Sequence, residues 1–211
     1  MRCYLCGTPE NLTRDHIPPK GFFPPPRPSN LITVPCCQSC NHEYSLDDEA
    51  MRLWFSASLG ASKAGEWIVE NKALKRSSAL LESLRKTMES TRLLTVEEGE
   101  IDATAYHIPF ERAERFLIRV TKGLLTHYFP VYDYSQAIFD VRHIPQTIDN
   151  LAKLEPLKNR LQYDSRGDEV FQYRGGLTES QQSGVWIFLF YGALLFAISH
   201  TKNNWGAEPS H

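Results

Sequence analysis

The residues best suited to chemistry lie near the start of the chain, where all five cysteines occur within the first forty residues. Cys3 and Cys6 form one C-x2-C pair, and Cys37 and Cys40 form a second. Each pair can present two thiolates to one ion from a tight turn, and two pairs complete a tetrahedral four-sulfur site. The spacing therefore predicts a structural zinc ion held by these four residues, with Cys36 as a spare thiol that stays a candidate ligand.

Two other uses of clustered cysteines fit this sequence less well. A secreted disulfide scaffold normally spreads an even number of cysteines through a short chain, and no apolar segment of the signal-peptide type begins this one. A thioredoxin-like redox motif uses a single C-x2-C between a strand and a helix. We therefore expect a reduced, cytoplasmic setting. Zinc would replace the core that a proline-rich segment of this length cannot build.

The segment between the two cysteine pairs carries further groups that can do chemistry. Asp15 and His16 precede Pro18 and Pro19, Asn30 lies midway, and Asn41 directly follows the last cysteine. Imidazole titrates near neutral pH and can accept a proton, and hard divalent cations prefer carboxylate and amide oxygens. Adjacent residues of a strand point to opposite faces. Asp15 and His16 can therefore share one metal only with a local bend, which the prolines are placed to hold.

The order and spacing of CYLCG, DHIPP, SNLITV and CCQSCN resemble the HNH, or ββα-metal, endonuclease family over roughly residues 3 to 49. This resemblance implies that His16 is the general base and that Asp15 and Asn41 hold one Mg²⁺ or Mn²⁺ ion. Asn30 would be a structural residue whose amide pins the loop that aims the base. His42 competes with Asn41, but neighbours on a helix are about 100° apart, so only one should face the ion. We favour Asn41, because the family residue directly follows the cysteine.

The resemblance implies a metal-dependent endonuclease that hydrolyses DNA, in restriction, phage defence or a mobile element, with RNA not excluded. The net charge of −2 indicates no general affinity for nucleic acid. A homodimer or a defence-system partner protein would therefore be expected to contribute to DNA binding. The family often has a basic residue shortly after the position of Asn41, whereas this chain has Glu43, Tyr44 and Ser45. The alternative function is a non-catalytic zinc-ribbon adaptor that binds nucleic acid or protein and makes no use of Asp15, His16 and Asn41.

The remaining elements predict an α+β protein. Residues 1–60 are expected to form the zinc-stapled ββα-metal module, in which the acidic residues 47–49 form a solvated helix turn, with a role in the site as the less favoured alternative. Residues 61–211 would form an α+β domain that positions substrate or binds a partner. Helices are predicted over 62–92 and 109–129, with a hairpin between them that turns at Glu98-Gly99. An antiparallel sheet should follow, built from the strand candidates QAIFDVRHI, RLQYDS, EVFQYRG, VWIFLFY and ALLFAIS.

The most apolar segment, Val185 to Ser199, raises the question of a membrane span. It is shorter than the ~20 residues that a spanning helix needs. Gly192 near its middle, with aromatic and β-branched residues before it, favours two buried strands joined by a tight bend. We therefore expect no membrane association. The histidines of this second part lack ligand spacing and are interpreted as ordinary side chains: His107, His127, His143 and His200.

Overall fold

The computed structural model describes residues 1–73, 95–96, 99–100 and 110–202. Within these residues the fold is α+β, with a five-stranded antiparallel sheet in the order β5-β9-β8-β7-β6. All five predicted strands are confirmed. Their bounds are Ala137–Ile144 for β5, Gln162–Arg166 for β6, Phe171–Leu177 for β7, Ser183–Phe190 for β8 and Leu194–Lys202 for β9.

The most apolar segment contributes to the central strand β8 and to its neighbour β9. Trp186, Phe188 and Phe190 alternate along β8 and are buried, as a strand with one face on a core requires. The chain turns into β9 at Tyr191 and Gly192, which have positive φ values of 51° and 70°, a conformation that glycine adopts at little cost. In the part of the chain that the structure describes, no helix is long and apolar enough to cross a membrane.

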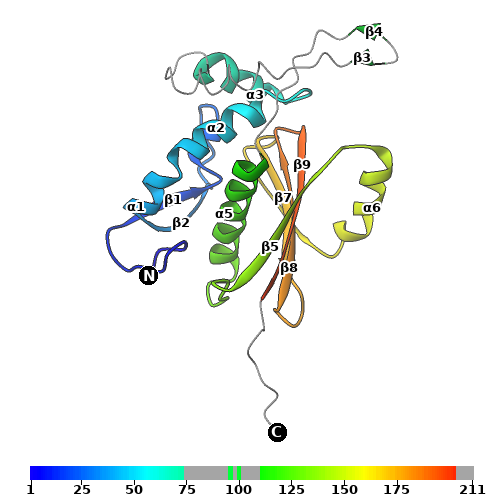
Figure 1. Ribbon diagram of the computed structural model, residues 1–211. Helices are drawn as coiled ribbons and strands as arrows, with labels where there is room; N and C mark the ends of the chain where they lie inside the picture. The colour runs from blue at the N-terminus through cyan, green and yellow to red at the C-terminus, as the bar shows by residue number, and fades with distance from the viewer. Residues whose placement is uncertain (74–94, 97–98, 101–109, 203–211) are drawn as a thin grey trace.

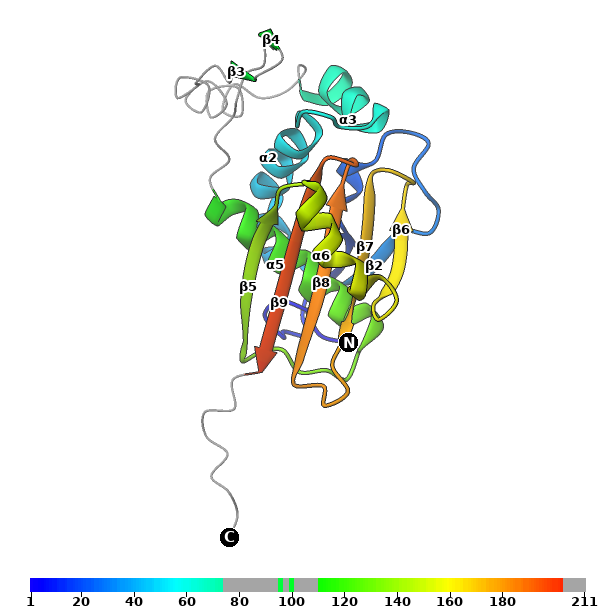
Figure 2. The same ribbon diagram turned by 90° about the vertical axis from the view of Figure 1, so that its right-hand side faces the viewer.

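Two helices cover the two faces of the sheet (Figure 1). α5, Phe110–Tyr128, packs its buried stripe on one face and confirms the helix predicted over 109–129. α6, Ile148–Lys158, lies over the other face, where Figure 2 shows it in front of the strands. The sequence analysis missed α6, because it has no buried residue and contains Pro156. Its start does carry a signal, since the Thr147 side chain accepts a hydrogen bond from Asn150 N.

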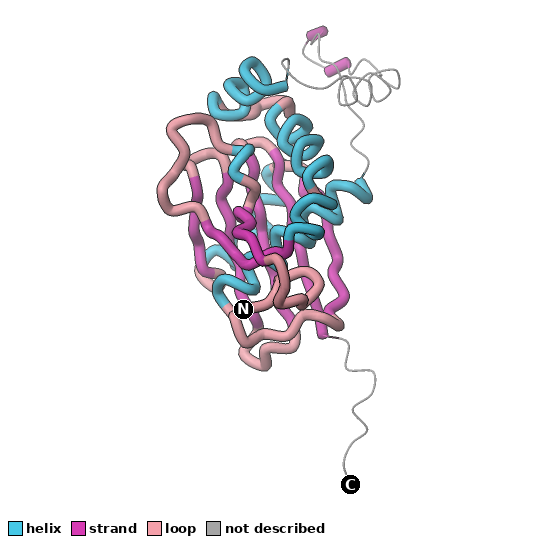
Figure 3. Tube along the Cα trace, turned by 90° about the vertical axis from the view of Figure 1, so that its left-hand side faces the viewer, coloured by secondary structure: helices cyan, strands magenta, loops and turns pink. Residues whose placement is uncertain are grey.

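The amino-terminal part forms a two-stranded hairpin followed by two helices (Figure 3). β1, Leu12–Ile17, pairs antiparallel with β2, Ile32–Cys37, and the loop between them contains the short 3-10 helix Lys20–Phe22. α1, Gln38–Glu43, begins directly after β2, and α2, Ser45–Ser56, follows it. The hairpin lies on the side of α5 that faces away from the sheet (Figure 1).

Aromatic side chains join the two parts of the chain in one core. Phe22 from the β1–β2 loop stacks on Phe116 of α5 with ring centroids 5.3 Å apart. Phe55 of α2 contacts Phe190 of β8 at 4.9 Å. Nearly all buried apolar side chains of the described residues belong to one contiguous cluster. The division at residue 60 stays a prediction, but the core runs across it without interruption.

α5 also approaches the hairpin very closely at Gly123. A Cβ atom at this position would lie 2.5 Å from Cγ1 of Ile17, which is itself 1% exposed. Real side chains do not come that close. The absence of a side chain at Gly123 therefore sets the distance between α5 and β1.

The segment between α2 and α5 is described only in part. α3, Lys63–Ile68, and the π-helical turn Val69–Ala73 begin where the helix over 62–92 is predicted, and its remainder lies outside the described residues. β3, Thr95–Val96, pairs antiparallel with β4, Gly99–Glu100. The predicted hairpin is therefore confirmed, but Gly99 pairs with Val96 in the strand instead of forming the turn.

Candidate functional site

The two C-x2-C pairs meet at one point. The sulfur atoms of Cys3, Cys6, Cys37 and Cys40 all lie within 4.8 Å of one another, and the sulfurs of Cys6 and Cys37 are 3.7 Å apart. Zn–S bonds of about 2.3 Å place neighbouring sulfurs of a tetrahedral site about 3.8 Å apart. The donor set and its spacing therefore fit a structural zinc ion. Cys36 is fully buried and does not belong to the group.

Local backbone geometry brings the sulfurs together. Gly7 N donates to Cys3 O at 2.9 Å and closes the first turn, and Cys40 N donates to the Cys37 sulfur at 3.4 Å at the start of α1. Burial raises the pKa of the Cys3 thiol, but backbone hydrogen bonds from Cys37, Cys6 and neighbouring residues outweigh it and lower the pKa to about 6. The cluster ties the first residues of the chain to the junction of β2 and α1.

Three of the four residues predicted for catalysis line one pocket. Asp15, His16 and Asn41 surround a hollow of about 410 Å³ between the end of β1 and the helices α1 and α2. His42 is exposed and does not line it, and the choice of Asn41 over His42 as a metal ligand stays a prediction. Asn30 lies apart, in the turn before β2, where it lines a different pocket beside the proline-rich loop.

The side chains of Asp15 and His16 project from opposite faces of the hairpin, as the alternation of side chains in a regular strand requires. β1 keeps its pairing through Ile17, with Asp15 opposite Val34 and His16 opposite Thr33. Asp15 is 5% exposed on the face turned toward the core, whereas His16 is half-buried on the other face. Both still line the same pocket, because it lies at the end of the strand.

The buried carboxylate of Asp15 has a specific partner in the zinc knuckle. Tyr4 lies between Cys3 and Cys6, and its hydroxyl donates a hydrogen bond to Asp15 Oδ2 at 2.8 Å. Burial and the nearby Asp15 carboxylate raise the pKa of Tyr4 well above its ordinary value. Tyr4 is therefore a permanent donor, and it connects the cysteine cluster to the candidate active pocket.

The acidic residues 47–49 are not the solvated helix turn that the sequence predicted. Asp48 forms an ion pair with Arg119 of α5, whose side chain is only 2% exposed. Asp47 binds Arg112 at 2.7 Å and Arg115 at 3.2 Å. The prediction was wrong because the partners lie on a distant helix. A signal was present, since these arginines recur at spacings of three and four residues, as one helix stripe does.

Asp48 adds a titratable group to the pocket. Burial raises the pKa of the Asp48 carboxyl to about 7, although Arg119 acts in the opposite direction, and the Asp15 carboxylate raises it further. Arg119 also lies over the ring of Tyr44, with 5.1 Å between its guanidinium carbon and the ring centroid. The second part of the chain thus supplies a buried cation directly behind the candidate site.

Positive side chains also line the pocket. Lys20 from the loop after β1, Arg14 from β1 and Arg52 from α2 face it together with the acidic groups. Burial and the nearby Lys20 lower the pKa of His16 below its usual value, and Asp15 opposes them only in part. The cations that the sequence lacks after Asn41 are therefore supplied by other elements.

Comparisons with protein-family models, with curated proteins and with solved structures found no match to this chain. The cysteine cluster is the only set of three or more His, Cys, Asp or Glu side chains close enough to hold an ion among the described residues. A second cation at the pocket would therefore have few protein ligands. Mg²⁺ is commonly bound by one or two protein oxygens and retained water molecules.

Proposed function

We propose that this chain is a metal-dependent endonuclease that hydrolyses phosphodiester bonds, with DNA as the expected substrate. One observation supports this proposal most directly. Asp15 and His16 precede the long proline-rich loop and Asn41 follows it, and yet all three line the same pocket beside the cysteine cluster. A half-buried imidazole, a buried carboxylate and an amide are the groups that metal-assisted phosphodiester hydrolysis needs.

Each residue has a role that follows from its surroundings. Asp15 and Asn41 would hold one Mg²⁺ or Mn²⁺ ion, and this ion would neutralise part of the negative charge of the phosphate. His16 would accept a proton from the attacking water. The hydrogen bond from Tyr4 orients the Asp15 carboxylate. Zinc in the cysteine cluster would be structural, because four thiolates leave no open position for substrate.

Cleavage of supercoiled plasmid tests the proposal. Purified zinc-loaded protein is incubated with plasmid and Mg²⁺ or Mn²⁺, and His16→Ala is compared with His42→Ala as a matched control on the exposed neighbour of Asn41. Wild type and His42→Ala should nick or linearise the plasmid, and His16→Ala should lose at least about 100-fold in rate, as expected for loss of a general base.

Two results would argue against the nuclease. Equal cleavage by wild type and His16→Ala would remove His16 from the reaction. Zinc-loaded wild type that binds DNA but cuts it with neither ion would instead favour the zinc-ribbon adaptor, which keeps the four cysteines without using Asp15, His16 and Asn41.

A further inference from the structure

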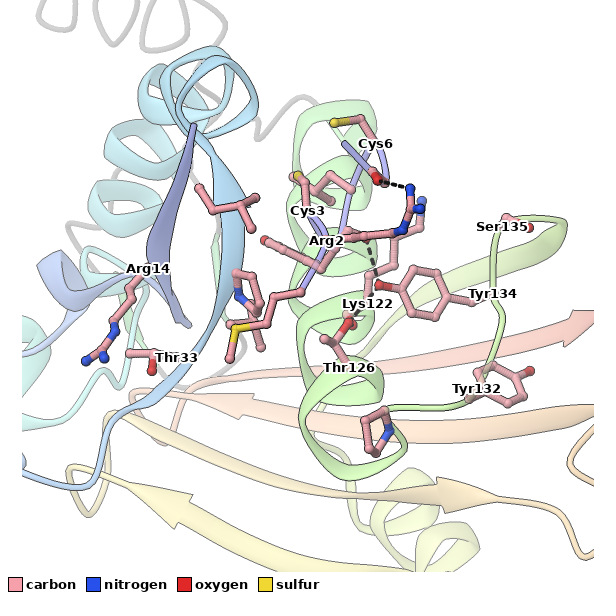
Figure 4. A pocket seen from close by; sticks show the side chains of 18 of the residues that line it. Arg2, Cys3, Cys6, Arg14, Thr33, Lys122, Thr126, Tyr132, Tyr134 and Ser135 are labelled. Atoms are coloured by element: carbon pink, nitrogen blue, oxygen red, sulfur yellow. Dashed lines mark hydrogen bonds between the residues drawn. The ribbon is translucent and has the colours of Figure 1, made fainter. Parts of the chain in front are cut away.

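A larger pocket, with a volume of about 1130 Å³, lies outside the candidate active pocket. It is formed by the amino-terminal knuckle, the β1–β2 hairpin, the end of α5 and the loop that follows α5 (Figure 4). We call it the knuckle groove. Its lining includes three cationic side chains, Arg2, Arg14 and Lys122, and one acidic side chain, Asp133. The groove therefore presents three cations and one carboxylate, beside the zinc-site thiolates of Cys3 and Cys6, which also line it.

Two of these cations have no acidic partner within the described residues. Lys122 is half-buried and its ammonium lies over the ring of Phe139, 5.6 Å from the centroid, without an ion pair. Arg14 is exposed and makes neither a hydrogen bond nor an ion pair with described residues. Arg2 is partly engaged, because it donates to Gly7 O in the knuckle at 3.2 Å. A half-buried, unpaired cation costs stability, and an anionic ligand would remove that cost.

The groove is continuous with the candidate active pocket through Arg14, which lines both. In Figure 4, Arg14 and Thr33 stand at one end of the groove, Tyr134 and Ser135 stand at the other, and Lys122 lies between them. Thr33 is the cross-strand partner of His16. A linear anion that passes His16 would therefore meet Arg14, the residue that the two pockets share.

We propose that the knuckle groove binds the sugar–phosphate backbone of the nucleic-acid strand that enters or leaves the candidate active pocket, with phosphates on Arg14 and Lys122. This inference rests on the proposed nuclease function. A polyanion fits better than a single small anion, because the cations are spread along the groove and the hydroxyl-bearing residues Thr33, Thr126 and Ser135 also line it. Lysine, arginine and hydroxyl side chains are the usual contacts to DNA phosphates.

Binding measured without cleavage tests the groove. Fluorescence anisotropy of a short labelled DNA duplex is recorded with zinc-loaded protein in Ca²⁺ buffer over a range of salt concentrations. The variants are Arg14→Gln and Lys122→Gln, and Lys153→Gln is the matched control on α6, across the sheet. Each lost phosphate contact should weaken binding roughly five- to eightfold at about 0.1 M salt and reduce the salt slope by about one. Lys153→Gln should bind like wild type.

The outcomes separate the groove from the catalytic proposal. The groove proposal fails if both groove variants bind DNA with wild-type affinity and salt slope. It also fails if Lys153→Gln weakens DNA binding as much as the groove variants do. If Lys122→Gln fails to fold, Arg2→Gln takes its place, because Arg2 is exposed and lines the groove but not the candidate active pocket. Groove-dependent binding with no cleavage in any metal would remove the nuclease but leave the groove. If the protein cleaves DNA but its groove variants bind DNA as wild type does, the nuclease proposal stands and the groove proposal fails.

Discussion

His200 on β9 should make the protein lose stability in mild acid. Its side chain is 1% exposed, and neither ring nitrogen has a hydrogen-bond partner among the described residues. Burial lowers the pKa of His200 from 6.5 to about 4. Because the folded-state pKa is depressed, the unfolded chain takes up a proton first as the pH falls from about 6.5 toward 4, and the folded state loses stability over that interval.

The size of this loss follows from the two pKa values. Between pH 7 and pH 5, an unfolded pKa of 6.5 and a folded pKa of about 4 correspond to a loss of about 2 kcal/mol from this one residue. A variant without a titrating group at this position, such as His200→Phe or His200→Gln, should not suffer that loss. The comparison concerns the change with pH, so a constant cost of either substitution cancels.

Urea unfolding at pH 7 and pH 5, followed by tryptophan fluorescence, measures the effect. The free energy of unfolding of wild type should fall by about 2 kcal/mol more than that of either variant. Groups common to all three proteins, including the cysteine cluster, contribute equally and drop out of the difference. An equal fall in wild type and both variants would refute the reasoning, because it would mean that His200 takes up its proton as readily in the folded protein as in the unfolded chain.

Two further substitutions test the metal cluster and the buried ion pair. Cys6→Ser should lose stoichiometric zinc in elemental analysis and lower the melting temperature, because Cys6 belongs to the four-sulfur group, whereas Cys36→Ser should keep its zinc. Retention of zinc by Cys6→Ser would contradict the assignment. Arg119→Leu should destabilise the fold in urea unfolding, because it leaves the Asp48 carboxyl, whose pKa burial already raises to about 7, without its partner. The control Arg115→Leu, whose side chain is 53% exposed, should cost less than about 1 kcal/mol, and equal costs would show that the burial of Arg119 carries no energetic weight.

Features encoded locally could be predicted from the sequence. The cysteine spacing predicted the metal cluster correctly, because each C-x2-C pair is a local motif and only one tertiary contact is needed to bring the two pairs together. The sheet strands were evident because their apolar residues are dense and their turns are marked. α6 was missed for the opposite reason, since none of its residues is buried and no apolar stripe marks it. Its capping residue Thr147 was the only usable sign.

Features that depend on tertiary contacts were not predictable in the same way. The sequence shows acidic residues at 47–49 and a row of arginines in α5, but only the fold brings Asp48 against Arg119. In the candidate site, Asp15, His16 and Asn41 do share a pocket, as the motif spacing suggested. Asn30 lines another pocket, because the long loop carries it away from the hairpin end. Its proposed structural role stays a prediction.

The close approach of Gly123 to Ile17 has an evolutionary consequence. A side chain at Gly123 fits only if Ile17 shrinks or β1 moves, so substitutions at the two positions should show strong epistasis, with Gly123→Ala harmful alone and rescued by a smaller residue at position 17. Ile17 directly follows His16. Variation at position 17, in the strand carrying Asp15 and His16, is therefore coupled to variation in α5.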